Sequence, residues 1–129
     1  MRRARSGLLS CAMRGLMMAM AVVVLSGCFP RAAPPPGELS SAEVEAVKSR
    51  WPDANAESLE HGRHVFLDHC DHCHGFPDLA YKSAADWPAT SARMGKKAEL
   101  DAGEIELLQR WIAAAQPKAV ETYAATQKK

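Results

Sequence analysis

This chain of 129 residues lacks a long apolar run, a basic stripe, internal repeats and the pattern of strands, and each absence excludes a class of protein. The longest apolar run, residues 16–25, has ten residues and is too short to span a bilayer as a helix. Beyond residue 28, twelve Lys and Arg stand against fifteen Asp and Glu, a net charge of −3. No basic stripe remains there to bind nucleic acid. Internal repeats and the alternating pattern of strands are absent too, so we expect one small all-α domain.

Cysteine and methionine are also scarce once the first 28 residues are set apart. Of the four cysteines, only Cys70 and Cys73 follow residue 28. A disulfide framework is therefore unnecessary, and this pair is free for other chemistry. Of the six methionines, only Met94 lies beyond Met20.

The first 28 residues are typical of a targeting segment. A basic stretch, residues 1–14, precedes the apolar run 16–25, as in a signal peptide. A short buried helix is the alternative, but the basic flank and the proline-rich stretch that follows disfavour it. Residues 25–28 (LSGC) resemble the lipobox of bacterial lipoproteins, which implies removal of residues 1–27 and lipid on Cys28. Ordinary cleavage nearby, with Cys28 left as a free thiol, is the other possibility.

We therefore expect a lipoprotein on the periplasmic side of the cell envelope. Phe29 and Pro30 follow Cys28 in place of the Asp that often retains such proteins in the inner membrane, which favours the outer membrane. The expected parts are a signal peptide (1–27), a stiff proline-rich tether (28–39), a helical domain (40–116) and a polar, frayed tail (117–129).

The first two expected helices precede the cysteine pair. Ser40 and Glu43 have capping-box spacing and predict a short helix that runs to about Arg50 and ends before Pro52. A second helix is expected over residues 55–69. Its apolar face contains Gly62, and a glycine in mid-helix indicates close approach of another helix.

Two further helices are expected after the cysteine pair. The third covers residues 86–94, with Asp86 as its cap, Pro88 in its first turn and Gly95 at its end. The last begins at the cap pair Asp101 and Glu104 and ends before Pro117. Its apolar stripe consists of Ile105, Leu108, Trp111 and Ile112.

Residues 70–74 (CDHCH) match C-x-x-C-H, the signature of c-type haem attachment. Two thiols at this spacing reach both vinyl groups of one haem and form thioether bonds with them. The next residue, His74, then lies under the iron and becomes an axial ligand. Three alternatives compete: a thioredoxin-like pair, which needs a βαβ setting; a zinc site; and coincidence in a solvated loop. A zinc site would use neighbouring histidines, namely His61, His64, His69 or His72.

Met94 is the candidate for the second axial ligand. It lies twenty positions beyond His74, which is enough chain to pass the haem edge and present a thioether from the opposite face. The alternative is that Met94 fills the core, the commoner role of methionine. The remaining histidines are expected to be solvated, because those next to the motif lie on the same side as His74.

Residues 57–115 resemble a small class I cytochrome c domain. Gly62-x-x-x-Phe66 is similar to the signature of its first helix, and Leu108-x-x-Trp111 to that of its last, and the two helices cross at near right angles in that family. The stretch from Trp87 through Met94 to Leu100 resembles the ending of short bacterial members. Two departures are the absence of Pro after Met94 and the short loop before it.

The resemblance implies roles for individual residues. Cys70 and Cys73 would attach the haem, and His74 and Met94 would ligate its iron. The carbonyl of Pro77 would accept a hydrogen bond from the His74 imidazole and raise its basicity. Haem-lining side chains would be those of Phe66, Trp87 and Leu108, together with Pro77.

The function that follows is single-electron transfer between redox-partner proteins, with one covalent haem c. Because both axial positions are filled, no open position is left for a small-molecule substrate, and an enzyme is not expected. Histidine–methionine ligation predicts a fairly high potential. The alternatives are a haem-based sensor, in which Met94 leaves to admit a gas, and a haem subunit of a larger oxidoreductase.

Overall fold

The computed structural model describes residues 31–128, which form four α-helices and a short 3₁₀ helix. The elements are α2 (Ser41–Val47), α3 (Ala56–His69), η1 (Leu79–Tyr81), α4 (Trp87–Lys97) and α5 (Ala102–Thr126). Within these residues no strand forms, and the one β-type contact is an isolated antiparallel bridge between Ala32 and Pro77. The predicted all-α class is confirmed. The predictions of a signal peptide and of lipid on Cys28 concern residues outside the described ones.

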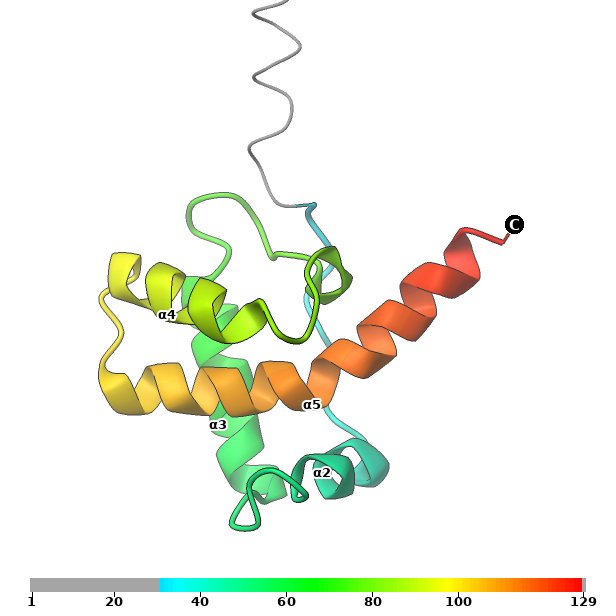
Figure 1. The fold of residues 1–129 in the computed structure, drawn as a ribbon. Helices are drawn as coiled ribbons and strands as arrows, with labels where there is room; N and C mark the ends of the chain where they lie inside the picture. Colours follow the sequence, from blue (N-terminus) through cyan, green and yellow to red (C-terminus); the bar gives the residue numbers. More distant parts are fainter. Residues whose placement is uncertain (1–30, 129) are drawn as a thin grey trace, which may run out of the picture.

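The fold is built around the place where α3 runs across α5 (Figure 1). A Cβ on Gly62 would clash with the Leu107 carbonyl oxygen and would lie 2.7 Å from Trp111 Cβ. Only a glycine lets the two backbones approach this closely. The close helix contact that the sequence predicts at Gly62 is confirmed.

The core has two apolar clusters, one on each side of this contact. The larger consists of Phe66, Leu79, Trp87, Leu100, Leu108, Trp111 and Ile112. The smaller consists of Val44, Val47, Ala54, Leu59 and Ala114, and it attaches α2 to α3 and α5. Burial of these side chains is what holds helices as short as α2, because a helix of seven residues is not stable by itself.

Capping boxes start three of the helices. Ser40 and Glu43 form one at α2, and Asp101 and Glu104 form one at α5, both as predicted. At α3 the pair is Asn55 with Ser58. In each case the side chain of the capping residue accepts from the backbone N–H three residues later, so local sequence decides where the helix begins.

The expected helix 86–94 extends further than its sequence pattern indicated. Gly95 lies inside α4, where Ile105 Cγ1 would be 2.7 Å from a Cβ, so Gly95 allows close packing and does not end the helix. The helix ends instead through Glu99 in the left-handed region (φ 60°), with the Leu100 N–H donating to the Gly95 carbonyl at 2.9 Å. Asp86 holds the N-cap position, but its carboxylate accepts from Ser83 Oγ at 2.6 Å and makes no cap bond.

The last helix also continues past its expected end. Pro117 was expected to follow this helix and residues 117–129 to fray, but α5 passes through Pro117 and runs to Thr126. Proline removes one backbone hydrogen bond and bends a helix without necessarily ending it. Figure 1 shows this bend, beyond which the helix continues as an arm. Tertiary contacts hold the arm: the Arg31 guanidinium lies 3.8 Å from the centre of the Tyr123 ring.

The two helices that flank the loop 70–86 do not approach each other closely along their backbones. Among the described elements, α4 packs on α5 and has no close backbone approach to α3. The loop joins the end of α3 to the start of α4, and η1 on this loop packs against α5. In the same residues, no helix combines the length and apolarity needed to cross a membrane.

Candidate functional site

The C-x-x-C-H motif occupies the end of α3 and the turn that follows. Cys70 is the C-cap of the helix, and its N–H donates to the Phe66 carbonyl at 3.0 Å. Residues 71–75 turn back at once, with the Gly75 N–H donating to the Asp71 carbonyl at 3.0 Å. Gly75 has φ 76°, a conformation that a side chain would strain, so glycine at this position lets the chain turn directly after His74.

The imidazole of His74 is half-buried and has a defined hydrogen bond. Its Nδ1 lies 2.9 Å from the Gly75 carbonyl oxygen. A carbonyl oxygen can only accept, so Nδ1 carries a proton, and in the neutral imidazole the lone pair is on Nε2. Nε2 is thus the ring nitrogen available to a metal, with the Gly75 carbonyl on the other side of the ring to fix its tautomer.

The prediction that the His74 imidazole donates to the Pro77 carbonyl is wrong. The bond goes to Gly75 and not to Pro77, which forms the isolated bridge with Ala32. In this bridge the Ala33 N–H donates to the Phe76 carbonyl and the Asp78 N–H donates to the Arg31 carbonyl. Residues 76–78 are paired with the N-terminal segment, and the left-handed turn at Gly75 brings the nearer carbonyl to the imidazole.

The two cysteines are free thiols in different environments. Cys70 is half-buried and packs against the larger apolar cluster, whereas Cys73 is exposed. Burial, together with the carboxylate of Asp71, raises the pKa of the Cys70 thiol to about 11. The thiol is therefore neutral near pH 7, unlike the thiolate of a thioredoxin-like nucleophile.

Met94 lies in the second half of α4 and is half-buried. It is not part of the apolar cluster, although its neighbour Gly95 packs on Ile105 and Ala98 touches the cluster. The structure therefore does not support the alternative in which Met94 fills the core. Lys96 and Lys97 at the end of α4 are exposed.

Three of the expected haem-lining residues share the larger apolar cluster. Phe66 and Leu108 are 1% and 2% exposed, and the Trp87 indole donates to the Leu79 carbonyl at 3.0 Å. Sequence reasoning missed Phe76, whose ring stacks on Phe66 with centroids 5.6 Å apart. The sequence contains a feature that could have indicated it, namely an aromatic residue two positions after His74. Stacking extends the apolar surface of α3 onto the motif loop.

The other histidines do not converge. His61 and His64 are exposed on α3, and His64 Nε2 lies 3.3 Å from the Glu60 carboxylate. His69 and His72 meet edge to face, with ring centroids 6.4 Å apart. Over residues 31–128, no three His, Cys, Asp or Glu side chains come together as metal ligands would. A zinc site made by these side chains alone is therefore not formed.

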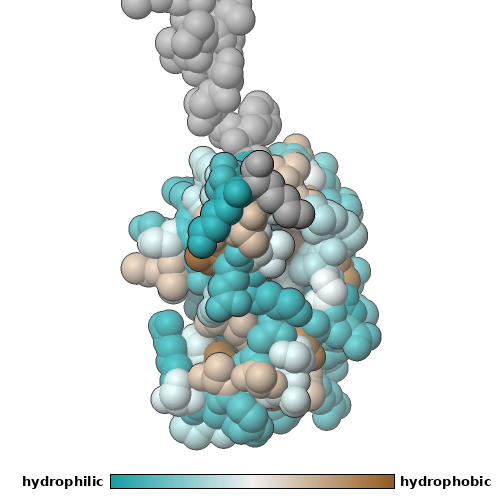
Figure 2. All heavy atoms as spheres, turned by 90° about the vertical axis from the view of Figure 1, so that its right-hand side faces the viewer, coloured by the Kyte–Doolittle hydropathy of each residue, from teal (hydrophilic) through white to brown (hydrophobic). Residues whose placement is uncertain are grey.

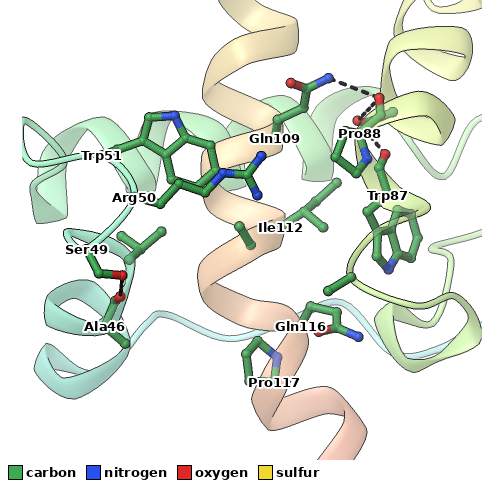
Figure 3. A pocket seen from close by; sticks show the side chains of 14 residues that line it. Ala46, Ser49, Arg50, Trp51, Trp87, Pro88, Gln109, Ile112, Gln116 and Pro117 are labelled. Atoms are coloured by element: carbon green, nitrogen blue, oxygen red, sulfur yellow. Dashed lines mark hydrogen bonds between the residues drawn. The ribbon is translucent and has the colours of Figure 1, made fainter.

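A pocket of about 240 Å³ lies elsewhere, between α2, α4 and α5 (Figure 3). Trp51 and Arg50 line one side and Trp87 and Pro88 the other, with Ile112 between them. The Arg50 guanidinium lies 4.4 Å from the centre of the Trp51 ring. Residues 70–78 line neither this pocket nor a second one beside Leu39, so neither pocket belongs to the motif.

Comparison with known proteins finds no matching family model, no matching curated protein and no matching solved structure.

Proposed function

We propose that this chain is an exported, lipid-anchored c-type cytochrome that passes single electrons between redox-partner proteins. Cys70 and Cys73 hold one haem c through thioether bonds, and His74 and Met94 ligate its iron. The observation that carries the proposal is the chemistry of residues 70–74: two thiols at attachment spacing, followed by an imidazole whose Nδ1 is tied to the Gly75 carbonyl.

The state of the thiols supports thioether formation over thiolate chemistry. The Cys70 thiol is half-buried against the apolar cluster, and its pKa is raised to about 11. The sulfur of a thioether is neutral and can stay buried beside apolar side chains at little cost. A thiolate at the same place would lose its hydration, which is costly. Cys73, at the exposed end of the turn, is accessible to the maturation machinery that attaches haem.

The surroundings of the motif support an apolar group next to it. Phe76, two residues after His74, stacks its ring on the buried Phe66, and Leu108 and Trp87 belong to the same cluster. α4 carries Met94 outside the apolar clusters, and its backbone does not approach that of α3. Cys70, Cys73 and His74 would hold a haem at this loop, and Met94 would supply a second ligand to its iron. The crossing of α3 and α5 at Gly62 supports the class I-like fold within this proposal.

A bound haem supplies Fe(II)/Fe(III) exchange. The chain would contribute His74 and Met94 as ligands of the iron, which would leave no position for a substrate. The thioether of Met94 would favour Fe(II) and so raise the potential. The lipid on Cys28 keeps the protein at a membrane surface, where its redox partners would also lie.

The deciding experiment is expression of the full chain in a host that matures c-type cytochromes. A denaturing gel of the membrane fraction, stained for haem peroxidase activity, is expected to show haem on the polypeptide. Cys73→Ala and His74→Ala should lose most of this stain. His72→Ala is the matched control, because it lies within the same motif at a position that attachment does not use, and it should keep the stain.

Other outcomes would redirect the proposal. Full-length protein without covalent haem in the maturing host would overturn it. Rapid carbon monoxide binding to the reduced protein at neutral pH would replace the electron carrier with the sensor alternative. Stable co-purification with a large membrane complex would replace the free carrier with an oxidoreductase subunit.

A further inference from the structure

The segment that follows the lipobox is attached to the motif loop. Ala33 donates its N–H to the Phe76 carbonyl at 2.9 Å, and Asp78 donates its N–H to the Arg31 carbonyl at 2.7 Å. Further along, Arg63 Nη1 donates to the Pro36 carbonyl at 3.3 Å, and Leu39 packs against both apolar clusters. Residues 31–39 therefore lie along the domain and are not a free spacer.

Arg31 links this segment to two separate parts of the fold. Its Nε donates to Asp78 Oδ2 at 2.6 Å, and its guanidinium lies over the Tyr123 ring at 3.8 Å. Asp78 in turn caps η1 by accepting the Ala80 N–H at 2.8 Å. The loop after His74, η1 and the arm of α5 thus meet at the first described residue of the chain, at the upper end of Figure 1.

Exposed apolar side chains gather at this same end. Within residues 31–128 the large apolar side chains that stay exposed are Tyr81, Val120 and Tyr123, at 43%, 41% and 37%. Val120 and Tyr123 are three apart on α5 and share a helix face. Tyr81 belongs to η1, which packs on α5, and the Lys82 ammonium lies 5.4 Å from the centre of its ring.

This combination is typical of a membrane interface. Tyrosine places an apolar ring and a polar hydroxyl across the headgroup region, and Lys and Arg side chains extend from there to water. On the face shown in Figure 2, apolar surface is broken into small areas among hydrophilic side chains, so no large apolar patch competes there. Such a contact orients a protein on a bilayer, and a lipid anchor must hold it there.

The length of chain between the anchor and Arg31 decides how near the bilayer this end lies. Cys28 precedes Arg31 by three residues. Three residues span at most about 11 Å even when fully extended. Because residues 31–33 are bonded to 76–78, that reach cannot be lengthened without breaking the bridge.

We propose that the end formed by Arg31, Tyr81, Val120 and Tyr123 rests on the phospholipid surface and holds the haem-attachment loop next to the bilayer. The inference rests on the lipid modification of Cys28 in the proposed function. It predicts that the bound domain has a fixed orientation, with the first turn of α3 pointing away from the membrane, and that electrons pass close to the membrane surface.

The test uses the lipidated holoprotein in vesicles of phosphatidylethanolamine and phosphatidylglycerol. Ala124→Cys on the arm of α5 and Ala56→Cys at the start of α3 form a matched pair of exposed alanines. A nitroxide label reacts only with the introduced cysteine of each variant, because thioether bonds occupy Cys70 and Cys73. The measurement is how strongly oxygen and a water-soluble nickel chelate each speed up the spin relaxation of the label. Oxygen concentrates in lipid and the chelate stays in water, so the two rates report whether the label lies near the bilayer.

The expected result is a higher oxygen-to-nickel ratio at position 124 than at position 56. A Gly-Ser linker inserted after Pro30 in a variant that also carries Arg31→Ala should bring the two ratios together. Equal ratios in the otherwise unchanged lipidated holoprotein would overturn this orientation and leave the proposed function intact. Absence of acyl chains on Cys28 by mass spectrometry, or of covalent haem on the gel, would overturn the proposed function itself.

Discussion

The backbone of Gly62 in α3 lies directly against the carbonyl of Leu107 in α5, and no side chain fits between them. Phe66, one turn later on α3, tilts against Trp111 with ring centroids 4.8 Å apart. This contact sets the position of the end of α3 and therefore of Cys70. A local steric fact about one glycine thus controls where the candidate attachment motif lies in the fold.

Gly62→Ala is expected to destabilise the protein. The obstacle is a backbone carbonyl, which cannot move aside as a flexible side chain can, so overpacking should cost about 1–3 kcal/mol and exceed the gain in helix propensity. Urea unfolding followed by circular dichroism measures the change. Gly37→Ala is the control, because nothing lies within 4 Å of a Cβ at that position, and it should leave the midpoint unchanged. An unchanged midpoint for Gly62→Ala would contradict the close helix contact.

Met94→Ala is expected to keep covalent haem and lose the sulfur ligand. The absorption band of methionine-ligated ferric haem should disappear, and the potential should fall because the thioether no longer favours Fe(II). Visible spectra and a redox titration of the purified protein measure both effects. Met94→His should restore a six-coordinate spectrum at a lower potential than the unmodified protein. A Met94→Ala spectrum identical to that of the unmodified protein would show that another residue is the distal ligand.

The two thiols of the haem-free protein should differ in reactivity. Burial raises the pKa of Cys70 to about 11, so at pH 8 almost none of it is the reactive thiolate, while Cys73 is exposed to solvent. Iodoacetamide is expected to modify Cys73 well before Cys70, as peptide mass spectrometry would report. In urea the difference should vanish. Equal rates in the folded chain would mean that Cys70 is not shielded as described.

Acid stability should depend on Glu60. The Arg63 guanidinium, hydrogen-bonded to Glu60 at 2.9 Å, holds the pKa of that carboxyl below its usual range. Because the folded pKa is the lower one, this stabilisation is complete above the unfolded value of about 4.3 and is lost as the pH falls through the folded pKa. Glu60→Gln should therefore lose stability near neutral pH and unfold with a weaker dependence on pH below 5.

A pH titration of the circular dichroism signal at several urea concentrations measures this effect. Glu57→Gln is the matched control, because Glu57 is exposed in the first turn of the same helix. It should leave the acid transition nearly unchanged. Glu60→Gln with the same acid transition as the unmodified protein would contradict the role of the Arg63 bond.

Sequence and structure agree best where the physics is local. Ser40 with Glu43 and Asp101 with Glu104 start helices as predicted, because a capping box is made by residues three apart and needs no tertiary contact. Agreement fails at Gly95, which was expected to end a helix, because whether a glycine terminates a helix or admits a neighbour depends on Ile105 in another element.

By itself the sequence determined the all-α class, the helix starts and the C-x-x-C-H spacing of residues 70–74, since each of these depends on neighbouring residues along the chain. Only the tertiary structure decided the partner of the His74 imidazole, the passage of α5 through Pro117 and the course of residues 31–39 along the domain. These features arise from contacts between distant residues, such as Arg31 with Asp78 and Tyr123, which offset local losses like the hydrogen bond missing at a proline.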